Sequence, residues 1–128
     1  GGRVLMLLQA QGLIKLKPEA GLKATPLDVS ENPKKLKFIE LDAAQLPRAL
    51  DDADVAAVNT NYAIQAGLLP SRDAIAIESL KSPYANVIAV RAADKDSPVL
   101  KKLLKAYHND EVKQFIKKEF KDSVFATW

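Results

Sequence analysis

The sequence contains no cysteine and only one histidine, and both shortages exclude particular kinds of site. Without cysteine the chain has no disulfide, no thiolate metal ligand and no cysteine nucleophile. A single histidine argues against a histidine-based zinc site and against a Ser-His-Asp triad. No other nucleophile stands beside a suitable base. The sequence therefore predicts no catalytic residues, no metal site and no cofactor, and we expect the protein not to be an enzyme.

Long apolar runs and basic stripes are missing as well. No apolar run reaches the roughly 18–20 residues that span a bilayer. The 19 basic residues are spread among 16 acidic ones, which gives a net charge of +3. A nucleic-acid surface would need a basic stripe with interleaved aromatic residues, so no nucleic acid is expected as a partner. The chain begins at Gly1 without a methionine, and we expect it to be a processed product or a fragment.

What the sequence does contain is an alternation of short apolar runs with amphipathic segments. In 128 residues that are 48% hydrophobic and 27% charged, this composition is typical of one globular core. The alternation predicts the α/β class. We expect strands near residues 36–41, 54–58, 74–78 and 87–91, a short exposed strand within 13–17, and helices near residues 3–11, 43–51, 60–66, 97–107 and 109–120.

Several residues mark the ends of these predicted helices. Gly12 is a natural left-handed stop after the first one. Pro47 lies inside the second, so that helix should be short or kinked. Ser97 followed by Pro98 predicts a helix start, and Asn109 with two acidic residues behind it predicts another.

The stretch Asp54–Ala63 is the first candidate for a binding site. Its apolar run, Val55 to Val58, is typical of a strand covered on both faces, and Asn59 follows directly. In open α/β sheets, ligands bind just beyond the carboxyl ends of strands, where a helix begins. The amide of Asn59 offers donors and an acceptor to a small polar ligand. The alternative is structural, with Asn59 or Thr60 capping the next helix.

The amino-terminal end of the chain is a second candidate. Two glycines precede Arg3 at the start of a predicted helix, where backbone N–H groups are open and anions are attracted. The planar guanidinium of Arg3 matches a carboxylate with two parallel hydrogen bonds. A carboxylate trap and a flexible terminus with a solvated arginine are both consistent with this pattern.

An acidic cluster precedes the central run. Asp51, Asp52 and Asp54 supply three carboxylates, which are suitable ligands for a hard cation. The spacing is not that of an EF-hand loop, and charge clusters in loops are usually solvated. We therefore interpret this cluster as a solvated loop.

Several longer motifs carry a resemblance to a known family. The chain resembles the substrate-binding lipoproteins of methionine ABC importers, the NlpA/MetQ family, over essentially its whole length. The most specific motifs are AQLPRALDD and the VNTNYA that follows it. The full set of matching segments is GGRVLMLLQAQGLIKLK at 1–17, ENPKKLKFIELDAAQLPRALDD at 31–52, VNTNYA at 58–63, SPYANVIAV at 82–90 and the closing FATW.

The resemblance implies a fold, a ligand and a location. The fold would be of the periplasmic-binding-protein type (type II), with methionine, in the L form or also the D form, enclosed between two lobes. Residues 1–83 would form the second lobe, and residues 84–128 would cross back and contribute to the first. Family members are anchored to a membrane by lipid in the periplasm and deliver methionine to a membrane permease. The N-terminal segment that forms most of the first lobe in the family is absent from this sequence and would be a partner.

The resemblance also implies three ligand-binding residues. Arg3 would pair with the α-carboxylate of methionine, while Asn59 and Asn86 would hydrogen-bond the amino-acid head. Tyr62 and Tyr84 lie beside these positions and could equally belong to the core. An alternative function is the effector-sensing domain of a transcription regulator, which uses a similar two-lobed design. That alternative would need a helix-turn-helix segment, and the sequence contains none.

Overall fold

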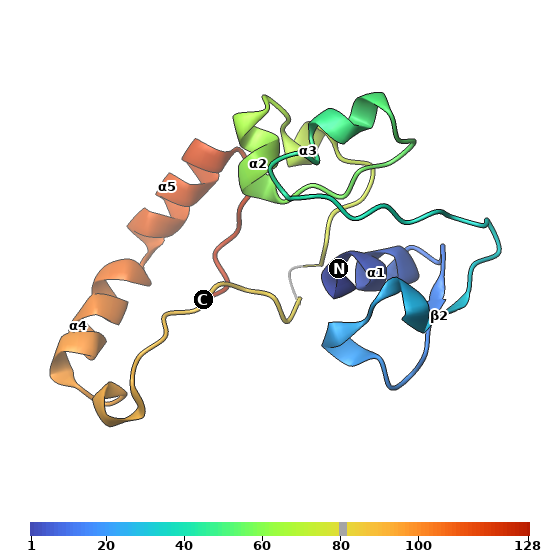
Figure 1. Ribbon diagram of the computed structural model, residues 1–128. Coiled ribbons are helices and arrows are strands. Elements are labelled where there is room, and N and C mark those ends of the chain that lie inside the picture. The colour runs from blue at the N-terminus through green and yellow to red at the C-terminus, as the bar shows by residue number, and fades with distance from the viewer. Residues whose placement is uncertain (80–81) are drawn as a thin grey trace. The chain divides into compact units, whose positions relative to one another are not determined.

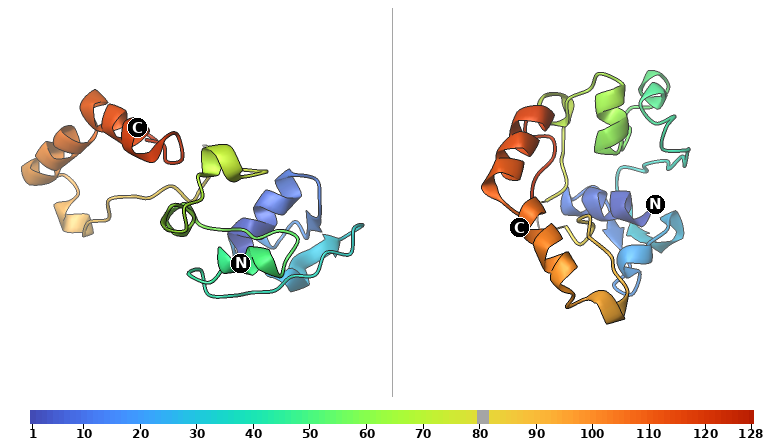
Figure 2. Two further views of the ribbon diagram at one scale, coloured as in Figure 1. Left: turned by 90° about the horizontal axis from the view of Figure 1, so that it is seen from above. Right: turned by 90° about the vertical axis from the view of Figure 1, so that its left-hand side faces the viewer.

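The structure is a computed structural model, and it describes residues 1–79 and 82–128. The chain divides into two compact units, Gly1–Glu78 and Ser79–Trp128. Figure 1 shows the elements along the chain, and Figure 2 shows the same ribbons from two further directions. Within the described ranges, no helix is both long enough and apolar enough to cross a membrane.

The helices and strands are short. In the first unit they are α1 (Gly2–Ala10), β1 (Lys15–Leu16), η1 (Gly21–Lys23), η2 (Pro26–Asp28), β2 (Val29–Glu31), η3 (Arg48–Asp51), α2 (Thr60–Gln65) and α3 (Pro70–Asp73), where η denotes a 3₁₀-helix. In the second unit they are η4 (Ala92–Asp94), α4 (Pro98–Tyr107) and α5 (Asp110–Phe120).

The core of the first unit lies between α1 and the hairpin that follows it. Leu5, Ile14 and Ala24 are buried there. β1 pairs with β2 in antiparallel orientation, with Lys15 opposite Glu31. The predicted short strand within 13–17 is thus confirmed, and Figure 1 shows its hairpin beside α1. The partly buried side chains around this core are Leu8, Leu16, Ala20, Val29, Leu36 and Phe38.

Glycines at both ends of α1 allow its placement. A Cβ on Gly2 would lie 2.6 Å from the carbonyl oxygen of Leu22 and 3.0 Å from that of Ala24, so the first turn approaches other backbone closely. Gly12 has a φ of +70° just beyond the helix, as expected for a left-handed stop. The helix predicted at 3–11 is confirmed, with its first residue one position earlier.

The predicted strands are the main correction. Residues 36–41, 54–58, 74–78 and 87–91 all run without regular secondary structure in this chain. Their apolar side chains include Ile75, which is 88% exposed, and Val87, which is 81% exposed. A buried strand of a parallel sheet needs neighbours on both edges and cover on both faces. Because the described residues give these segments no such neighbours, their apolar sequence alone does not make them strands.

The helix predicted at 43–51 is wrong in extent. Residues 43–47 form turns, and only Arg48–Asp51 is helical, as the 3₁₀-helix η3. The N–H of Gln45 donates to the carbonyl of Asp42 at 2.9 Å, a spacing of three residues rather than four. Pro47 explains the interruption, since it has no N–H and its ring collides with the preceding turn.

The polar cluster after residue 58 does begin a helix, α2, as predicted. It ends at Gln65, and Gly67 shortly beyond it has a φ of +77°. A second helical turn, α3, follows and was not predicted, because a proline placed after a helix is also typical of a helix terminator. Pro70 is instead the first residue of α3, where a missing N–H costs nothing. The Asp73 carboxylate accepts the N–H of Leu69 at 2.8 Å and so closes this turn.

Both predicted helices of the second unit are present, and their caps act as expected. The Ser97 hydroxyl accepts the N–H of Leu100 at 3.1 Å and starts α4. The Asn109 side-chain oxygen accepts the N–H of Val112 at 2.9 Å and starts α5. In the part of the chain that the structure describes, the buried apolar residues all belong to the first unit. The apolar faces of α4 and α5 are only partly covered: Val99, Leu103 and Phe115 are exposed, whereas Leu104, Ile116 and Phe120 are half-buried.

An aromatic cluster closes the second unit. The imidazole of His108 stacks on the indole of Trp128, with ring centres 4.5 Å apart and planes 16° apart. Tyr107 lies tilted against the same indole at 5.5 Å. Figure 2 shows the C-terminus beside the junction of α4 and α5. The indole N–H is buried and has no hydrogen-bond partner among the described residues.

Candidate functional site

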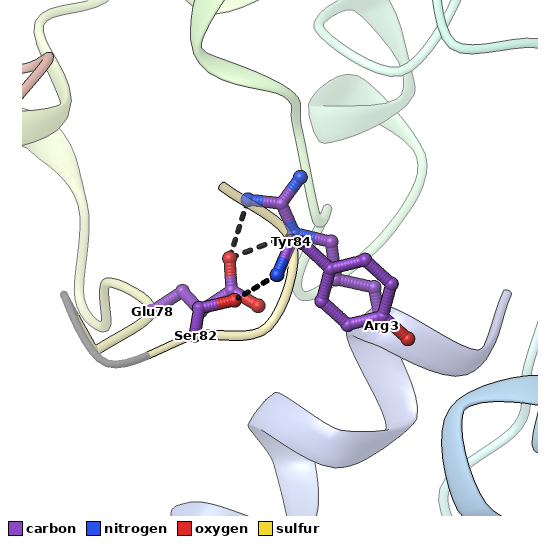
Figure 3. A network of polar contacts seen from close by, with 4 residues as sticks. All are labelled: Arg3, Glu78, Ser82 and Tyr84. Atoms are coloured by element: carbon purple, nitrogen blue, oxygen red, sulfur yellow. Dashed lines mark hydrogen bonds and ion pairs between the residues drawn. The ribbon is translucent and has the colours of Figure 1, made fainter. Parts of the chain in front are cut away.

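Arg3 lies on the first turn of α1 and is engaged in an ion pair. Its Nε donates to one carboxylate oxygen of Glu78 at 2.7 Å, and its Nη2 donates to the same oxygen. Figure 3 shows the guanidinium and the carboxylate facing each other, with dashed lines marking both hydrogen bonds. Arg3 is thus not the solvated arginine of a flexible terminus.

The local fold explains why the two side chains meet. The glycine at position 2 lets the first turn approach the backbone at Leu22 and Ala24, which fixes where Arg3 emerges. Glu78 comes from the far end of the same unit, 75 residues along the chain. The pair is partly solvated, since the side chain of Arg3 is 49% exposed and that of Glu78 is 23% exposed. Partly exposed ion pairs contribute only about 0–1 kcal/mol to stability, so this pair orients side chains more than it stabilises the fold.

Asn59 occupies the N-cap position of α2, but its side chain does not act as a cap. The backbone is extended at Asn59, with φ −66° and ψ 141°, and its carbonyl accepts the N–H of Ala63 at 3.0 Å. The side-chain amide makes no capping hydrogen bond, and the residue is exposed. Asn59 therefore caps α2 only through its backbone carbonyl. Its side-chain amide is left for another role.

Asn86 lies in the second unit. It is exposed and follows a turn in which the backbone N–H of Tyr84 donates to the hydroxyl of Ser82 at 3.1 Å. Figure 3 also marks this hydrogen bond. Arg3 and Asn59 belong to the first unit, so the three predicted ligand residues are not assembled within one unit.

Glu78 is the polar residue that the sequence prediction missed. It directly follows the apolar run at 74–77, just as Asn59 follows the run at 55–58. The sequence rule for strand ends that made Asn59 a candidate would therefore have made Glu78 a candidate as well. The sequence thus contains the same pattern twice, a polar residue directly after an apolar run, and only the run at 55–58 was interpreted as a site.

Two other features of the first unit lie apart from these residues. The carboxylates of Asp51, Asp52 and Asp54 are exposed, and the described residues contain no group of acidic or histidine side chains arranged to hold a metal ion. An open hollow of about 400 Å³ lies along the hairpin, and none of the predicted ligand residues lines it. Its lining residues are Gln9, Gly12, Ile14, Lys15, Glu31 and Pro33.

Comparison with known proteins decides the family. The family model described as NlpA lipoprotein matches residues 1–128, the entire chain. The chain belongs to the NlpA lipoprotein family. The resemblance inferred above all from the AQLPRALDD and VNTNYA motifs is therefore confirmed.

Curated and structurally known relatives show how this chain compares in length with the proteins that it matches. It is 50% identical to the D-methionine-binding lipoprotein MetQ of Escherichia coli (strain K12), matching 99% of this chain and 48% of that protein. A nutrient binding protein from Burkholderia cenocepacia, solved bound to methionine, is 64% identical with a TM-score of 0.87; the match covers 99% of this chain and 54% of the other. The chain thus spans about half the length of the relatives it matches.

A third relative extends the structural comparison. An ABC transporter periplasmic substrate-binding protein from Coxiella burnetii is 55% identical with a TM-score of 0.85, over 96% of this chain and 52% of that one. These structural relatives have the periplasmic-binding-protein fold of type II, so the predicted α/β fold class is confirmed.

Proposed function

We propose that the protein is the substrate-binding component of an ABC importer and that its substrate is methionine. One observation carries this proposal: the chain matches, over 99% of its length, a protein whose structure holds methionine. The relatives are named as binding proteins, which supports binding and release without chemistry. The names of the relatives include D-methionine, so both stereoisomers belong in any binding assay.

Arg3, Asn59 and Asn86 are the proposed contacts to the amino-acid head. A zwitterion needs a cationic donor pair for its carboxylate and neutral polar groups for the rest of the head. Arg3 supplies the first, and its guanidinium already holds a carboxylate in this structure, that of Glu78. The amide of Asn59 is exposed and not used as a cap, which supports its availability to a ligand.

The family of the chain also supports a proposal for the partner and the cellular location of the protein. The protein would be lipid-anchored in the periplasm and would hand methionine to a membrane permease, in keeping with the lipoprotein and ABC transporter names of its relatives. In this proposal residues 1–83 form one lobe, and residues 84–128 return to the other.

The exposed apolar segments of the chain support one further partner, which would cover them. The chain spans about half of each relative, and its predicted strands carry exposed apolar residues such as Val55, Ile75 and Val87. These segments would pair with residues of the kind that the relatives carry outside the matched half. Exposed apolar stretches and unpaired strand edges usually mark such missing neighbours.

Calorimetry of the longest natural protein that contains these residues tests the proposal. We expect it to bind methionine, and Arg3→Ala to weaken that binding about tenfold or more, because a buried carboxylate loses its charged partner. Arg3→Lys should restore only part of the affinity, since a point charge replaces a planar fork. Arg72→Ala is the control, because Arg72 is paired with its neighbour Asp73.

Two results would contradict the proposal at different levels. A wild-type protein that binds neither stereoisomer of methionine would refute the function. Normal wild-type binding with unchanged affinity in both Arg3 variants would leave the function standing and rule out the carboxylate role of Arg3.

A further inference from the structure

We propose that α4 docks on a membrane surface of anionic phospholipids through three lysines, Lys101, Lys102 and Lys105, which together form its lysine face. The lysine face contains none of the proposed methionine contacts. The inference rests on the proposed function in one respect, the location of the protein at a membrane. It adds to that location a side of the second unit that faces the lipid.

Positive charge is concentrated in the second unit. Residues 79–128 contain ten basic and six acidic residues, whereas residues 1–78 contain nine basic and ten acidic ones. The excess positive charge of the chain therefore belongs to the second unit. Within that unit α4 has three lysines and no acidic residue, while α5 mixes its lysines with Asp110, Glu111 and Glu119. The unmixed positive charge thus lies on α4.

The helix brings the three lysines together. Two leucines separate Lys102 from Lys105 in the sequence, so no continuous basic run is visible there. With about 3.6 residues per turn, positions 101, 102 and 105 fall on one side of α4, and Leu100 and Leu103 fall on the other. All three lysines are exposed, and within the described ranges none has an ion-pair partner. Their charge is therefore not neutralised by a neighbouring side chain.

The lysine face should stay in contact with water in the longer protein. The chain spans about half of its relatives, and the opposite, apolar side of α4, where Leu103 is exposed, would receive the further residues that they carry. An ammonium group is almost never buried without a partner, because removing its hydration is costly. Covering the apolar side thus leaves the lysine face open to an anionic partner.

An anionic lipid surface fits the lysine face in charge and in place. Lysine carries a point charge on a flexible stem, which suits a plane of mobile headgroups better than a rigid planar group does. A single acyl chain gives only marginal, reversible attachment to a membrane, and a polybasic patch is one of the signals that make the attachment stable. The family model that matches the chain is that of a lipoprotein, so such a second signal has a use here. Each lysine near an anionic surface contributes about fivefold in affinity, and three contribute about a hundredfold.

The test is co-sedimentation of the longest natural protein that contains these residues, prepared without attached lipid, with phospholipid vesicles. We expect binding to vesicles of phosphatidylcholine mixed with phosphatidylglycerol, and none to vesicles of phosphatidylcholine alone, whose headgroups carry no net charge. About 1 M salt should release the protein, because it shortens the screening length to about 3 Å. Lys105→Gln should weaken binding about fivefold, and the triple change Lys101→Gln, Lys102→Gln and Lys105→Gln should weaken it about a hundredfold.

The matched control is the triple change Lys34→Gln, Lys35→Gln and Lys37→Gln in the first unit. These lysines are exposed as well, so the control removes the same charge from another surface. It should bind the mixed vesicles as the wild type does. Both triple variants should bind methionine normally in calorimetry. The α4 variant should also keep its helix content in circular dichroism, because glutamine and lysine have similar helix propensities.

Several results would overturn the inference. Equal weakening by the two triple variants would mean that net charge, and not α4, draws the protein to lipid. Binding that persists in high salt would assign the contact to an apolar surface. Loss of methionine binding in the α4 triple variant would mean a general effect on the fold. A wild type that binds methionine but not the mixed vesicles would refute the lipid contact and leave the proposed substrate standing, whereas one that binds the vesicles but no methionine would support the lipid contact and refute the substrate.

Discussion

A methyl group added at Gly2 tests whether the start of α1 lies where the structure places it. The new Cβ of Gly2→Ala would meet the carbonyl oxygen of Leu22 at 2.6 Å and that of Ala24 at 3.0 Å. Both atoms belong to backbone, so the overlap cannot be relieved by turning a side chain. Forcing extra atoms into such a packed place typically costs 1–3 kcal/mol, about 2 kcal/mol here. The better helix propensity of alanine would offset at most about 1 kcal/mol of it.

Denaturant unfolding, followed by circular dichroism, measures this cost. Gly2→Ala should lower the free energy of unfolding by about 1–2 kcal/mol after that offset. Arg3 is the next residue, so methionine affinity should fall as well, although Gly2 offers no side chain to a ligand. The matched control is Gly12→Ala at the other end of α1. That alanine would have open space around its Cβ and a strained φ of +70°, so stability should fall while affinity stays.

Two results for the Gly2→Ala and Gly12→Ala variants would refute this reasoning. If Gly2→Ala unfolds at the same denaturant concentration as the wild type, the first turn does not pass close to the backbone at Leu22. If both glycine variants reduce affinity to the same degree, the effect on binding comes from stability alone and not from the position of Arg3.

Three further predictions concern other parts of the chain. Asn109→Ala should cost about 1 kcal/mol of unfolding free energy through loss of the α5 cap, whereas Asn109→Ser should retain most of it. The hydrogen bond from the Arg72 side chain, with that from the Leu69 N–H, lowers the pKa of Asp73 from 3.8 to about 2. Asp73 should therefore stabilise the fold above about pH 4 and lose that effect as the pH falls toward 2, so unfolding of Asp73→Asn should depend less on pH in this window. The isolated 128-residue chain should self-associate in light scattering, because its apolar faces are only partly covered; a stable monomer of 14.0 kDa that binds methionine tightly would contradict this.

The helices were predictable from sequence because their signals are local. Ser97 and Asn109 show in one short segment where α4 and α5 begin, and the structure places their side chains on the expected N–H groups. The sequence predicted that Pro47 would shorten or kink the helix at 43–51, but not that only Arg48–Asp51 would be helical. The turn at Pro70 was missed because proline both ends helices and begins them, and the sequence pattern alone does not choose.

The strands could not be predicted in the same way. Residues 55–58 and 87–90 have the composition of buried strands, but a strand forms only when a neighbour supplies hydrogen bonds and cover. The site shows the same limit. Arg3 and Asn59 became candidates through their places at element ends and remain predictions, whereas the ion pair with Glu78 joins residues 75 positions apart, and no local pattern encodes that meeting.

The stack of Trp128 on His108 gives the chain a built-in optical reporter. It is the only tryptophan of the 128 residues, and it lies against the only histidine. Intrinsic fluorescence excited at the indole band therefore samples one place, the end of α4 and the carboxyl terminus. Arg3 and Asn59 lie in the first unit, whereas Asn86 shares the second unit with Trp128, so a ligand-dependent change in emission would report on the second unit.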